Sequence, residues 1–362
     1  MNQNYTTEKI NEESGKQMDQ KAEFQATEDH SIELHLPKLE DVQHPLVPND
    51  KQNNYKLREI NGTTDLQLLS YVVNDPDYFA MLEGEAGVGK NMAIDVLCNS
   101  ANWPRVRVNF GIGTTYQNLV GRYAPVEEGD IVDETVSRIN AVEKTAQRIE
   151  NNNIDSETAR KRAEKTLPEG SKFKWSDGLL TKAVKNGWMF IADEINAADN
   201  EAILPLNGLT ENNQDRYLTI EEKSEIIHPH ENFRMIATRN PLTYAGVSEM
   251  NAALESRAYV VQFDYHENGA IEEILKDNTN ILENESENAL KQLVSLAQDI
   301  RRMEQEGNQF VTKISTRDLL KVGRLTDIMN IRDATKTVFL GIADPTDKQS
   351  LKEMINTQKF GV

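Results

Sequence analysis

The stretch Gly84-Glu85-Ala86-Gly87-Val88-Gly89-Lys90-Asn91 decides the fold of this chain. The apolar run Tyr78-Phe79-Ala80-Met81-Leu82 precedes it and Met92-Ala93-Ile94-Asp95-Val96-Leu97 follows it, which predicts a strand, a glycine-rich loop and a helix. The glycines let the loop amides point inward, and such a row of N–H groups at a helix N-terminus binds phosphate oxygens. Lys90 adds a cation that can reach β- and γ-phosphates. The spacing fits G-x-x-x-x-G-K-[ST] except at Asn91, where a hydroxyl normally holds magnesium.

A second stretch, Trp188-Met189-Phe190-Ile191-Ala192-Asp193-Glu194, predicts a buried parallel strand that ends in two acids. Ligands of open α/β sheets bind at the carboxyl ends of the strands. Asp193 is therefore placed to bind in the coordination shell of a magnesium ion. Glu194 is placed to polarise a water molecule for attack on a γ-phosphate. Taken alone, the first stretch could be a glycine-rich turn with an incidental lysine, and the second a strand with an exposed Asp-Glu turn. Together they favour the Walker A loop and Walker B strand of one nucleotide site.

The composition limits the class of partner. The chain has 362 residues and a formal net charge of −19 at pH 7. This acidity argues against nucleic acid, whose affinity for proteins comes mostly from cationic contacts, and against an anionic membrane surface. The one cysteine, Cys98, excludes an intrachain disulfide and a multi-cysteine metal site. No apolar run approaches membrane-spanning length and the N-terminus has no apolar signal region, so we expect a cytoplasmic protein.

Two parts of the chain lack the sequence pattern expected of the packed α/β core. Residues 1–54 are polar and of mixed charge, which predicts a disordered or loosely attached tail. Within it, Ile32-Glu33-Leu34-His35-Leu36 alternates like a short strand, which would either dock on a neighbour or stay transiently extended. Residues 125–170 form an insertion whose helical spacing predicts a projecting helical hairpin, with a poorly ordered insertion as the alternative. We expect an irregular segment from Gly121 and a turn at 173–178.

The remaining patterns predict further strands of the same sheet. Residues 104–110, 233–238 and 258–263 have strand character, and residues 217–228 indicate a β-hairpin. Asn240 follows the fourth core strand, so we expect it at the sheet edge that carries the loop and the two acids.

Beyond Asp264 the patterns are helical, over residues 269–277, 287–305, 315–329 and 331–341. The predicted fold class is α/β, with a five-stranded parallel sheet flanked by helices and an all-helical lid. The predicted domains follow in chain order: an N-terminal tail at 1–54, a nucleotide-binding core at 55–265, a lid at 266–345 and a C-terminal tail at 346–362.

These features resemble an AAA+ ATPase over roughly residues 58–340. Residues 102–109 and 119–122 are similar to the corresponding stretches of CobS-type cobaltochelatase subunits. Trp175-Ser176-Asp177-Gly178-Leu179-Leu180, Ala192-Asp193-Glu194-Ile195-Asn196 and Gln262-Phe263-Asp264-Tyr265 resemble the MoxR, CbbQ/NorQ and midasin group. These groups share a helix-2 insert and a hairpin before the sensor 1 strand, and the sequence does not choose among them.

The resemblance implies that ATP and Mg²⁺ bind between adjacent subunits of a ring, commonly a homo-hexamer. It implies nucleotide contacts from Gly84, Glu85, Ala86, Gly87, Val88, Gly89, Lys90 and Asn91 in Walker A. Asn91 and Asp193 would hold the metal, and Glu194 would be the catalytic carboxylate that polarises the attacking water. Asn240 matches sensor 1, Arg257 matches the arginine finger that reaches a neighbour's γ-phosphate, and Arg317 matches sensor 2 on the lid. Cations around the transferring phosphoryl group are what this chemistry requires.

Each of the last three matches also has a purely structural interpretation. Asn240 precedes Pro241 and could be a turn residue, Arg257 could form a surface ion pair, and Arg317 could pair with a neighbouring acid. Two departures from the pattern bear on turnover. Asn91 offers an amide oxygen with a different reach from a hydroxyl, and Ala258 follows Arg257 where the family usually has an aromatic residue.

Four functional hypotheses follow. The first is an ATP-driven remodelling chaperone of the MoxR type, whose relatives often work with a von Willebrand factor A-domain protein. The second, motivated by Asn91, is a nucleotide-gated scaffold that binds ATP and hardly hydrolyses it. The third is a nucleic-acid motor, which the acidic charge disfavours, and the fourth is a chelatase accessory role with a chelatase-like client.

Overall fold

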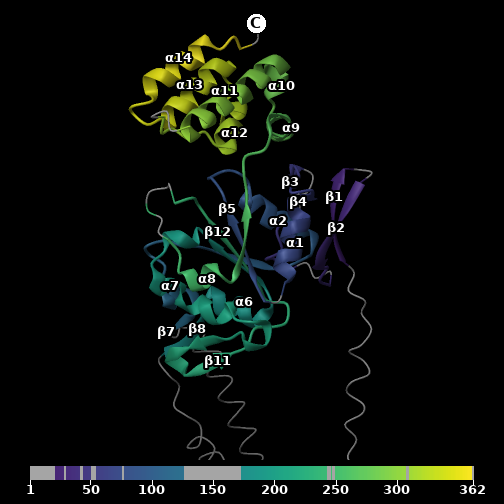
Figure 1. Ribbon diagram of the computed structural model, residues 1–362, viewed down its shortest axis with the longest axis vertical. Helices are drawn as coiled ribbons and strands as arrows, with labels where there is room; N and C mark the ends of the chain where they lie inside the picture. Colours follow the sequence, from purple (N-terminus) through teal and green to yellow (C-terminus); the bar gives the residue numbers. More distant parts are fainter. Residues whose placement is uncertain are drawn as a thin grey trace, which may run out of the picture.

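The computed structural model describes residues 21–27, 30–40, 44–49, 54–75, 77–125, 173–242, 246, 249–306 and 310–360. Figure 1 shows an α/β body with a group of helices above it, which contains the C-terminus. No helix in this described part of the chain has the length and apolar character that crossing a membrane requires.

The centre of the body is a five-stranded parallel sheet, which confirms the predicted fold class. Its strands are β5 (Phe79–Glu83), β6 (Arg105–Asn109), β9 (Met189–Asp193), β12 (Arg234–Arg239) and β13 (Ala258–Gln262). They lie in the order β13-β5-β12-β9-β6, and every neighbouring pair is parallel. Because β5, β12 and β9 are adjacent, the segments that follow them meet at one edge of the sheet.

Helices cover both faces of the sheet because the side chains of its strands alternate between two apolar cores. Ala80 and Leu82 of β5 pack with α1 (Asp65–Asn74) and α2 (Lys90–Ser100). Phe79 and Met81 point to the other core, on the opposite face of the sheet. The elements on that side are α3 (Tyr116–Leu119), α6 (Leu179–Asn186), α7 (Asn200–Asn207), η3 (Gly208–Thr210) and α8 (Ala252–Glu255).

The prediction of a polar tail over residues 1–54 is wrong for residues 21–37. β1 (Lys21–Thr27) and β2 (His30–Pro37) form an antiparallel hairpin beside α1 (Figure 1). Phe24 and Leu34 are fully buried in the core that α1 and α2 share. The alternation seen at Ile32–Leu36 is therefore a strand that docks on its own domain rather than on a neighbour. Residues 1–20 lie outside the described residues.

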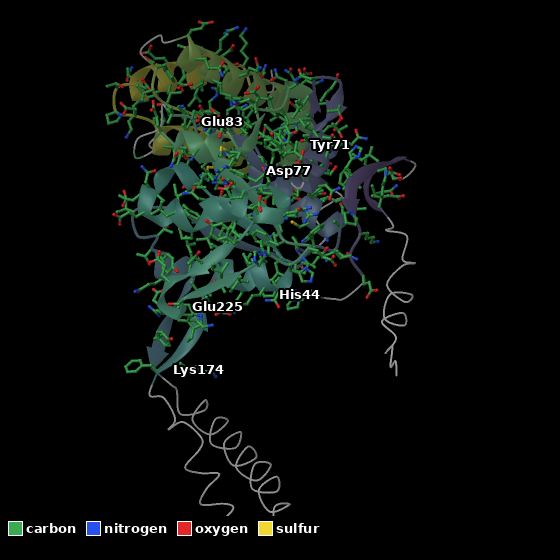
Figure 2. All side chains as sticks on the ribbon, turned by 60° about the horizontal axis from the view of Figure 1, so that its bottom comes forward. His44, Tyr71, Asp77, Glu83, Lys174 and Glu225 are labelled. Carbon is green, nitrogen blue, oxygen red and sulfur yellow. The ribbon has the colours of Figure 1, made fainter. Side chains whose placement is uncertain are left out.

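A second correction concerns the segments on either side of the insertion. Residues 121–125, predicted as irregular, form β7 (Gly121–Pro125), and residues 173–177, predicted as a turn, form β8 (Phe173–Asp177). The two strands pair antiparallel, with Lys174 near the outer end (Figure 2). The predicted helical hairpin at 125–170 lies almost entirely outside the described residues, because 126–172 are not among them.

The predicted β-hairpin at 217–228 is confirmed. It consists of β10 (Leu218–Ile220) and β11 (Glu225–Ile227), which pair antiparallel. Short elements complete the body: β3 (Glu59–Ile60), β4 (Thr63–Thr64), η2 (Ile195–Ala197), η4 (Asn213–Asp215) and η5 (Glu221–Lys223).

The chain leaves the body after β13 and enters the helical lid. The lid helices are α9 (Asn268–Asn278), α10 (Ile281–Asn284), α11 (Glu287–Gln305), α12 (Thr316–Leu325), α13 (Ile331–Ile342) and α14 (Lys348–Thr357). They share an apolar core of their own. Leu351 and Ile355 of α14 are fully buried in that core, so the lid continues past residue 345, where we predicted a C-terminal tail.

Candidate functional site

A cavity of about 370 Å³ lies where the glycine-rich loop, the carboxyl edge of the sheet and the lid meet. The loop residues Glu85–Asn91 line one side. Asp193, Glu194 and Asn240 line the sheet edge, and Arg317 lines the lid side. The structure thus places the predicted loop, both acids, the sensor 1 asparagine and the sensor 2 arginine around one space.

The loop reaches its shape through glycines in the left-handed region. Gly87 has φ +79° and Gly89 has φ +101°, conformations that residues with a Cβ adopt at a cost. A Cβ on Gly87 would also lie 2.7 Å from Cβ of Ser315, the N-cap residue of α12. Glycine at 87 therefore lets the lid sit directly against the loop.

Lys90, at the start of α2, is buried at the sheet edge. Its ammonium donates to the carbonyl oxygens of Gly84 (2.5 Å) and Glu85 (3.1 Å) and to Oδ1 of Asn240 (3.2 Å). Burial lowers the pKa of Lys90, while the carboxylate of Asp193 and its acidic neighbours oppose that shift. The result is a cation held between the loop and the sheet, where it can meet phosphate oxygens.

Asn91 and Asp193 form the part of the site that suits a metal. Nδ2 of Asn91 donates to Oδ2 of Asp193 over 2.9 Å, and Oγ1 of Thr238 donates to Oδ1 of Asp193 over 2.5 Å. Oδ1 of Asn91 is buried and has no hydrogen-bond partner. An orphaned amide oxygen beside a carboxylate offers the hard oxygen ligands that Mg²⁺ prefers. Among the described residues, no group of three or more His, Cys, Asp or Glu is arranged to hold a metal ion.

Glu194 and Asn240 face each other across the strand ends. Glu194 has φ +56° and ψ +42°, a conformation that costs free energy for a residue with a side chain. Its backbone N–H donates to Oγ1 of Thr238 over 3.0 Å, which helps hold it there. Nδ2 of Asn240 donates to Oε1 of Glu194 over 3.3 Å. The carboxylate and the amide are therefore close enough to contact the same water molecule beside them.

The family models match two parts of the chain. The description "AAA domain (dynein-related subfamily)" matches residues 152–258, and "CbbQ/NirQ/NorQ C-terminal" matches residues 272–358. The chain belongs to the AAA+ family. The matched C-terminal part is the lid, which is of the CbbQ/NorQ type. The first match begins downstream of the glycine-rich loop, so the loop's assignment depends on its own pattern and geometry.

Relatives of this AAA+ protein include uncharacterized staphylococcal proteins. One, from Staphylococcus haemolyticus, is 29% identical over 180 residues, which cover 49% of this chain and just under two thirds (66%) of that protein. Another, from Staphylococcus epidermidis, is 25% identical over 277 residues, covering 76% of this chain and 88% of that protein. Among solved structures, a candidate ATPase from Cytophaga hutchinsonii has a TM-score of 0.39 and 15% identity over 79% of this chain and 78% of that one. A TM-score of that size does not decide the fold.

Two predicted site residues do not line the cavity: Gly84, whose carbonyl oxygen accepts from Lys90, and Arg257. Arg257 lies just before β13, and its Nη2 pairs with Oε1 of Glu211 over 2.8 Å. Its Nη1 approaches the carbonyl oxygen of Asn207 at 3.5 Å. The side chain is about one-third exposed. In this AAA+ protein Arg257 therefore does not line the cavity formed by the described residues of its own chain, and it forms the ion pair that was the alternative interpretation.

Two supporting residues of the AAA+ site escaped the sequence analysis. Asn196 is almost fully buried, and its Nδ2 donates to the carbonyl oxygen of Asn240 over 2.9 Å. Thr238, in β12, links Asp193 to the backbone of Glu194 as described above. The available signals were Thr238 at the end of the apolar run Met235-Ile236-Ala237, and Asn196 shortly after the two acids Asp193 and Glu194.

Proposed function

We propose that this AAA+ protein binds ATP with Mg²⁺ in the cavity and hydrolyses it to ADP and phosphate. The observation that carries the proposal is the convergence of the ammonium of Lys90, the Asn91–Asp193 pair and the Glu194–Asn240 pair on one space. These groups supply a phosphate cation, oxygen ligands for a metal and a water-orienting pair, which are the parts that phosphoryl transfer to water needs.

Each residue has a task in the proposed reaction. The loop amides hold the α- and β-phosphates, Lys90 reaches the β- and γ-phosphates, and Asn91 and Asp193 would hold the metal. When bound, Mg²⁺ would neutralise charge that develops on the phosphate oxygens. Glu194 orients the attacking water and accepts its proton, while Asn240 fixes the direction of the Glu194 carboxylate. Arg317 lies on the lid side of the same cavity, where it adds positive charge opposite the loop.

We further propose that the protein works as a ring, commonly a hexamer, and that Arg257 acts on the nucleotide of the next subunit. Support comes from the position of Arg257 outside its own cavity and from the ring assembly typical of AAA+ proteins. Within a ring, the output would be remodelling of a partner protein in the cytoplasm. The MoxR- and CobS-like stretches favour a von Willebrand factor A-domain protein or a chelatase-like client.

Replacing Lys90 with alanine tests the binding site itself. We expect Lys90→Ala to weaken ATP binding about 10- to 100-fold, because a charge-assisted hydrogen bond is worth roughly 1.5–3 kcal/mol. Titration calorimetry with ATP and Mg²⁺ would measure the affinity for ATP, and an assay of released phosphate would measure the turnover. Lys185→Ala, which removes an ammonium paired with Asp177 well away from the cavity, is the matched control. Wild-type protein that releases no phosphate at any magnesium concentration would contradict the enzyme proposal.

Asn91 favours a second candidate function, a scaffold that binds ATP and assembles with little hydrolysis. Its amide is already engaged with Asp193, whereas a threonine hydroxyl would reach the metal with a different geometry. If the scaffold reading holds, Asn91→Thr should raise the rate of phosphate release at least about tenfold, equivalent to about 1.4 kcal/mol off the barrier. Turnover that is fast in the wild type and unchanged in Asn91→Thr would rule the scaffold out.

A further inference from the structure

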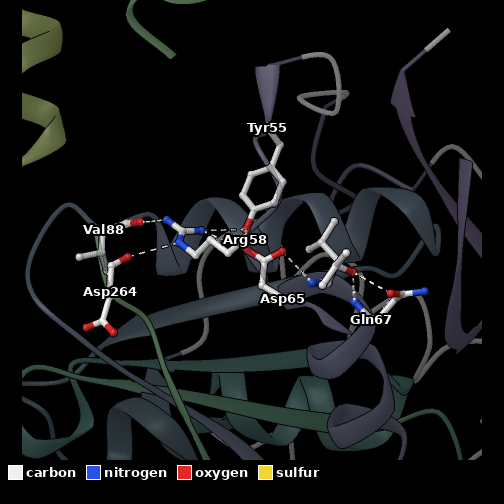
Figure 3. A network of polar contacts seen from close by, with 8 residues as sticks. Tyr55, Arg58, Asp65, Gln67, Val88 and Asp264 are labelled. Carbon is white, nitrogen blue, oxygen red and sulfur yellow. Dashed lines mark hydrogen bonds and ion pairs between the residues drawn. The ribbon is translucent and has the colours of Figure 1, made fainter. Parts of the chain in front are cut away.

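Arg58 is a buried arginine that none of the Walker or sensor motifs contains. It lies in the segment 54–58, here called the strap, which precedes β3 and runs beside the nucleotide cavity. Arg58 is 8% exposed. Figure 3 shows its guanidinium at the centre of contacts with Val88 of the loop, with Asp264 beyond β13, and with Tyr55 and Asp65.

The contact with the loop fixes one peptide group of the cradle. Nη2 of Arg58 donates to the carbonyl oxygen of Val88. Because the peptide between Val88 and Gly89 is planar and trans, the N–H of Gly89 points away from that carbonyl. The guanidinium also abuts the loop closely, since a Cβ on Gly89 would lie 3.0 Å from Nη2. Arg58 therefore sets the direction of the amide that stands next to Lys90.

The remaining nitrogens hold the guanidinium in place. Nη1 donates to Oδ2 of Asp65 over 3.1 Å and to the hydroxyl oxygen of Tyr55 over 3.1 Å. The Tyr55 hydroxyl donates in turn to Asp65 over 2.6 Å, and Asp65 is fully buried. The planar guanidinium of an arginine can donate hydrogen bonds to all of these partners at once, whereas the ammonium of a lysine on its flexible side chain cannot.

Arg58 also reaches the connection to the lid. Its Nε donates to the carbonyl oxygen of Asp264 over 3.3 Å, and its guanidinium carbon lies 5.1 Å from the ring centre of Phe263. Elsewhere in the strap, Lys56 pairs with Asp277 of α9 over 2.8 Å. The strap thus touches the loop, the exit from the sheet and the first lid helix.

We propose that Arg58 is a positioning residue for the nucleotide. It presents the Gly89 amide to the phosphates by fixing the Val88 carbonyl, and it joins the loop to the segment that leads into the lid. The inference rests on the proposed function, because it assumes that phosphates occupy the cradle. Loop amides of this kind hold the α- and β-phosphates, which ATP and ADP share. Loss of the contact should therefore weaken both nucleotides by the same factor.

The test compares two variants with the wild-type full-length chain. Arg58→Lys keeps a positive charge opposite Asp65 but cannot keep the Val88 and Asp264 contacts together. We expect its Kd for ADP and for ATP to rise about tenfold each, the factor that corresponds to one charge-assisted hydrogen bond. KM should rise by a similar factor with kcat changed by less than about threefold, because the loss is shared by ground state and transition state. Hydrogen exchange of the peptide 84–91 should become faster.

Arg234→Lys is the matched control, because Arg234 is a partly buried arginine that donates to the carbonyl oxygens of Glu231 and Phe233 and does not line the nucleotide cavity. We expect it to lower the thermal unfolding midpoint about as much as Arg58→Lys does, with less than about threefold change in the Kd for ADP. Wild-type affinity in Arg58→Lys would overturn the inference, and so would a loss of affinity that follows the unfolding midpoint in both variants. Wild-type protein that binds neither ADP nor ATP would instead overturn the proposed function.

Discussion

Arg257→Ala is expected to reduce ATP turnover about 10³- to 10⁵-fold while each subunit keeps its affinity for ATP, because an arginine finger contributes that much to phosphoryl transfer. The separation of the two effects follows from geometry. Arg257 pairs with Glu211 and does not line the cavity of its own chain. Steady-state phosphate release and an ATP-binding titration on the same preparation would measure both quantities.

A mixing experiment shows whether Arg257 acts on the next subunit. Arg257→Ala subunits keep an intact cavity, and Lys90→Ala subunits keep an intact Arg257. Mixed rings should therefore regain part of the activity that each variant lacks alone. Arg302→Ala, which removes an exposed lid arginine paired with Asp299, should leave turnover unchanged. Full activity in pure Arg257→Ala rings, or no recovery on mixing variants that assemble, would contradict the proposed role.

The parallel sheet was predictable because each core strand is a short apolar run with its own end signal. β5 ends at the glycine-rich loop, β9 ends at Asp193, and β12 ends at Arg239, directly before Asn240. Such signals are local, and the rule that ligands meet the carboxyl ends of strands then brings them together. The same reasoning explains why the loop, the acids and Asn240 were expected around one space.

The β1–β2 hairpin and the β7–β8 pair could not be recognised because their evidence is not local. The inward face of β1 contributes Ala22 and Phe24 between polar residues, so the segment resembles a tail until the surface of α1 and α2 is known. β7 and β8 pair across a gap of chain from 126 to 172, so no short turn links them to signal a hairpin. In both cases tertiary packing decides what a weak pattern becomes.

The supporting residues of the site were missed for a related reason. The roles of Asn196 and Thr238 appear only when β9 and β12 lie side by side. Arg58 is separated from the loop by β3, β4, α1 and β5, and nothing in its neighbourhood in the sequence distinguishes it from a surface arginine. Motifs therefore predict groups that meet the nucleotide, whereas groups that orient those groups depend on contacts between distant segments.

Glu194→Gln is expected to reduce phosphate release about 10²- to 10⁴-fold, the usual contribution of a positioned general base. The amide keeps an oxygen that can accept from Nδ2 of Asn240, so the shape of the site is preserved. It loses the negative charge that polarises the water and accepts its proton. ATP affinity should therefore stay within about twofold of wild type, and the ATP-bound state should persist.

Because its ATP-bound state should persist, Glu194→Gln can be used to capture the partner protein, whereas Lys90→Ala cannot. A ring that holds ATP without turning it over should retain its partner, so a pull-down with Glu194→Gln in ATP and Mg²⁺ should recover the client that wild type releases. Glu201→Gln, an exposed acid on α7, is the matched control for turnover and for capture. If Glu194→Gln hydrolyses ATP like the wild type, the proton acceptor is another group and the proposed mechanism is wrong at its central residue. If it loses ATP affinity together with turnover, the carboxylate contributes to nucleotide binding. The proposal that Lys90 binds the nucleotide while Glu194 serves only the hydrolysis step would then be wrong.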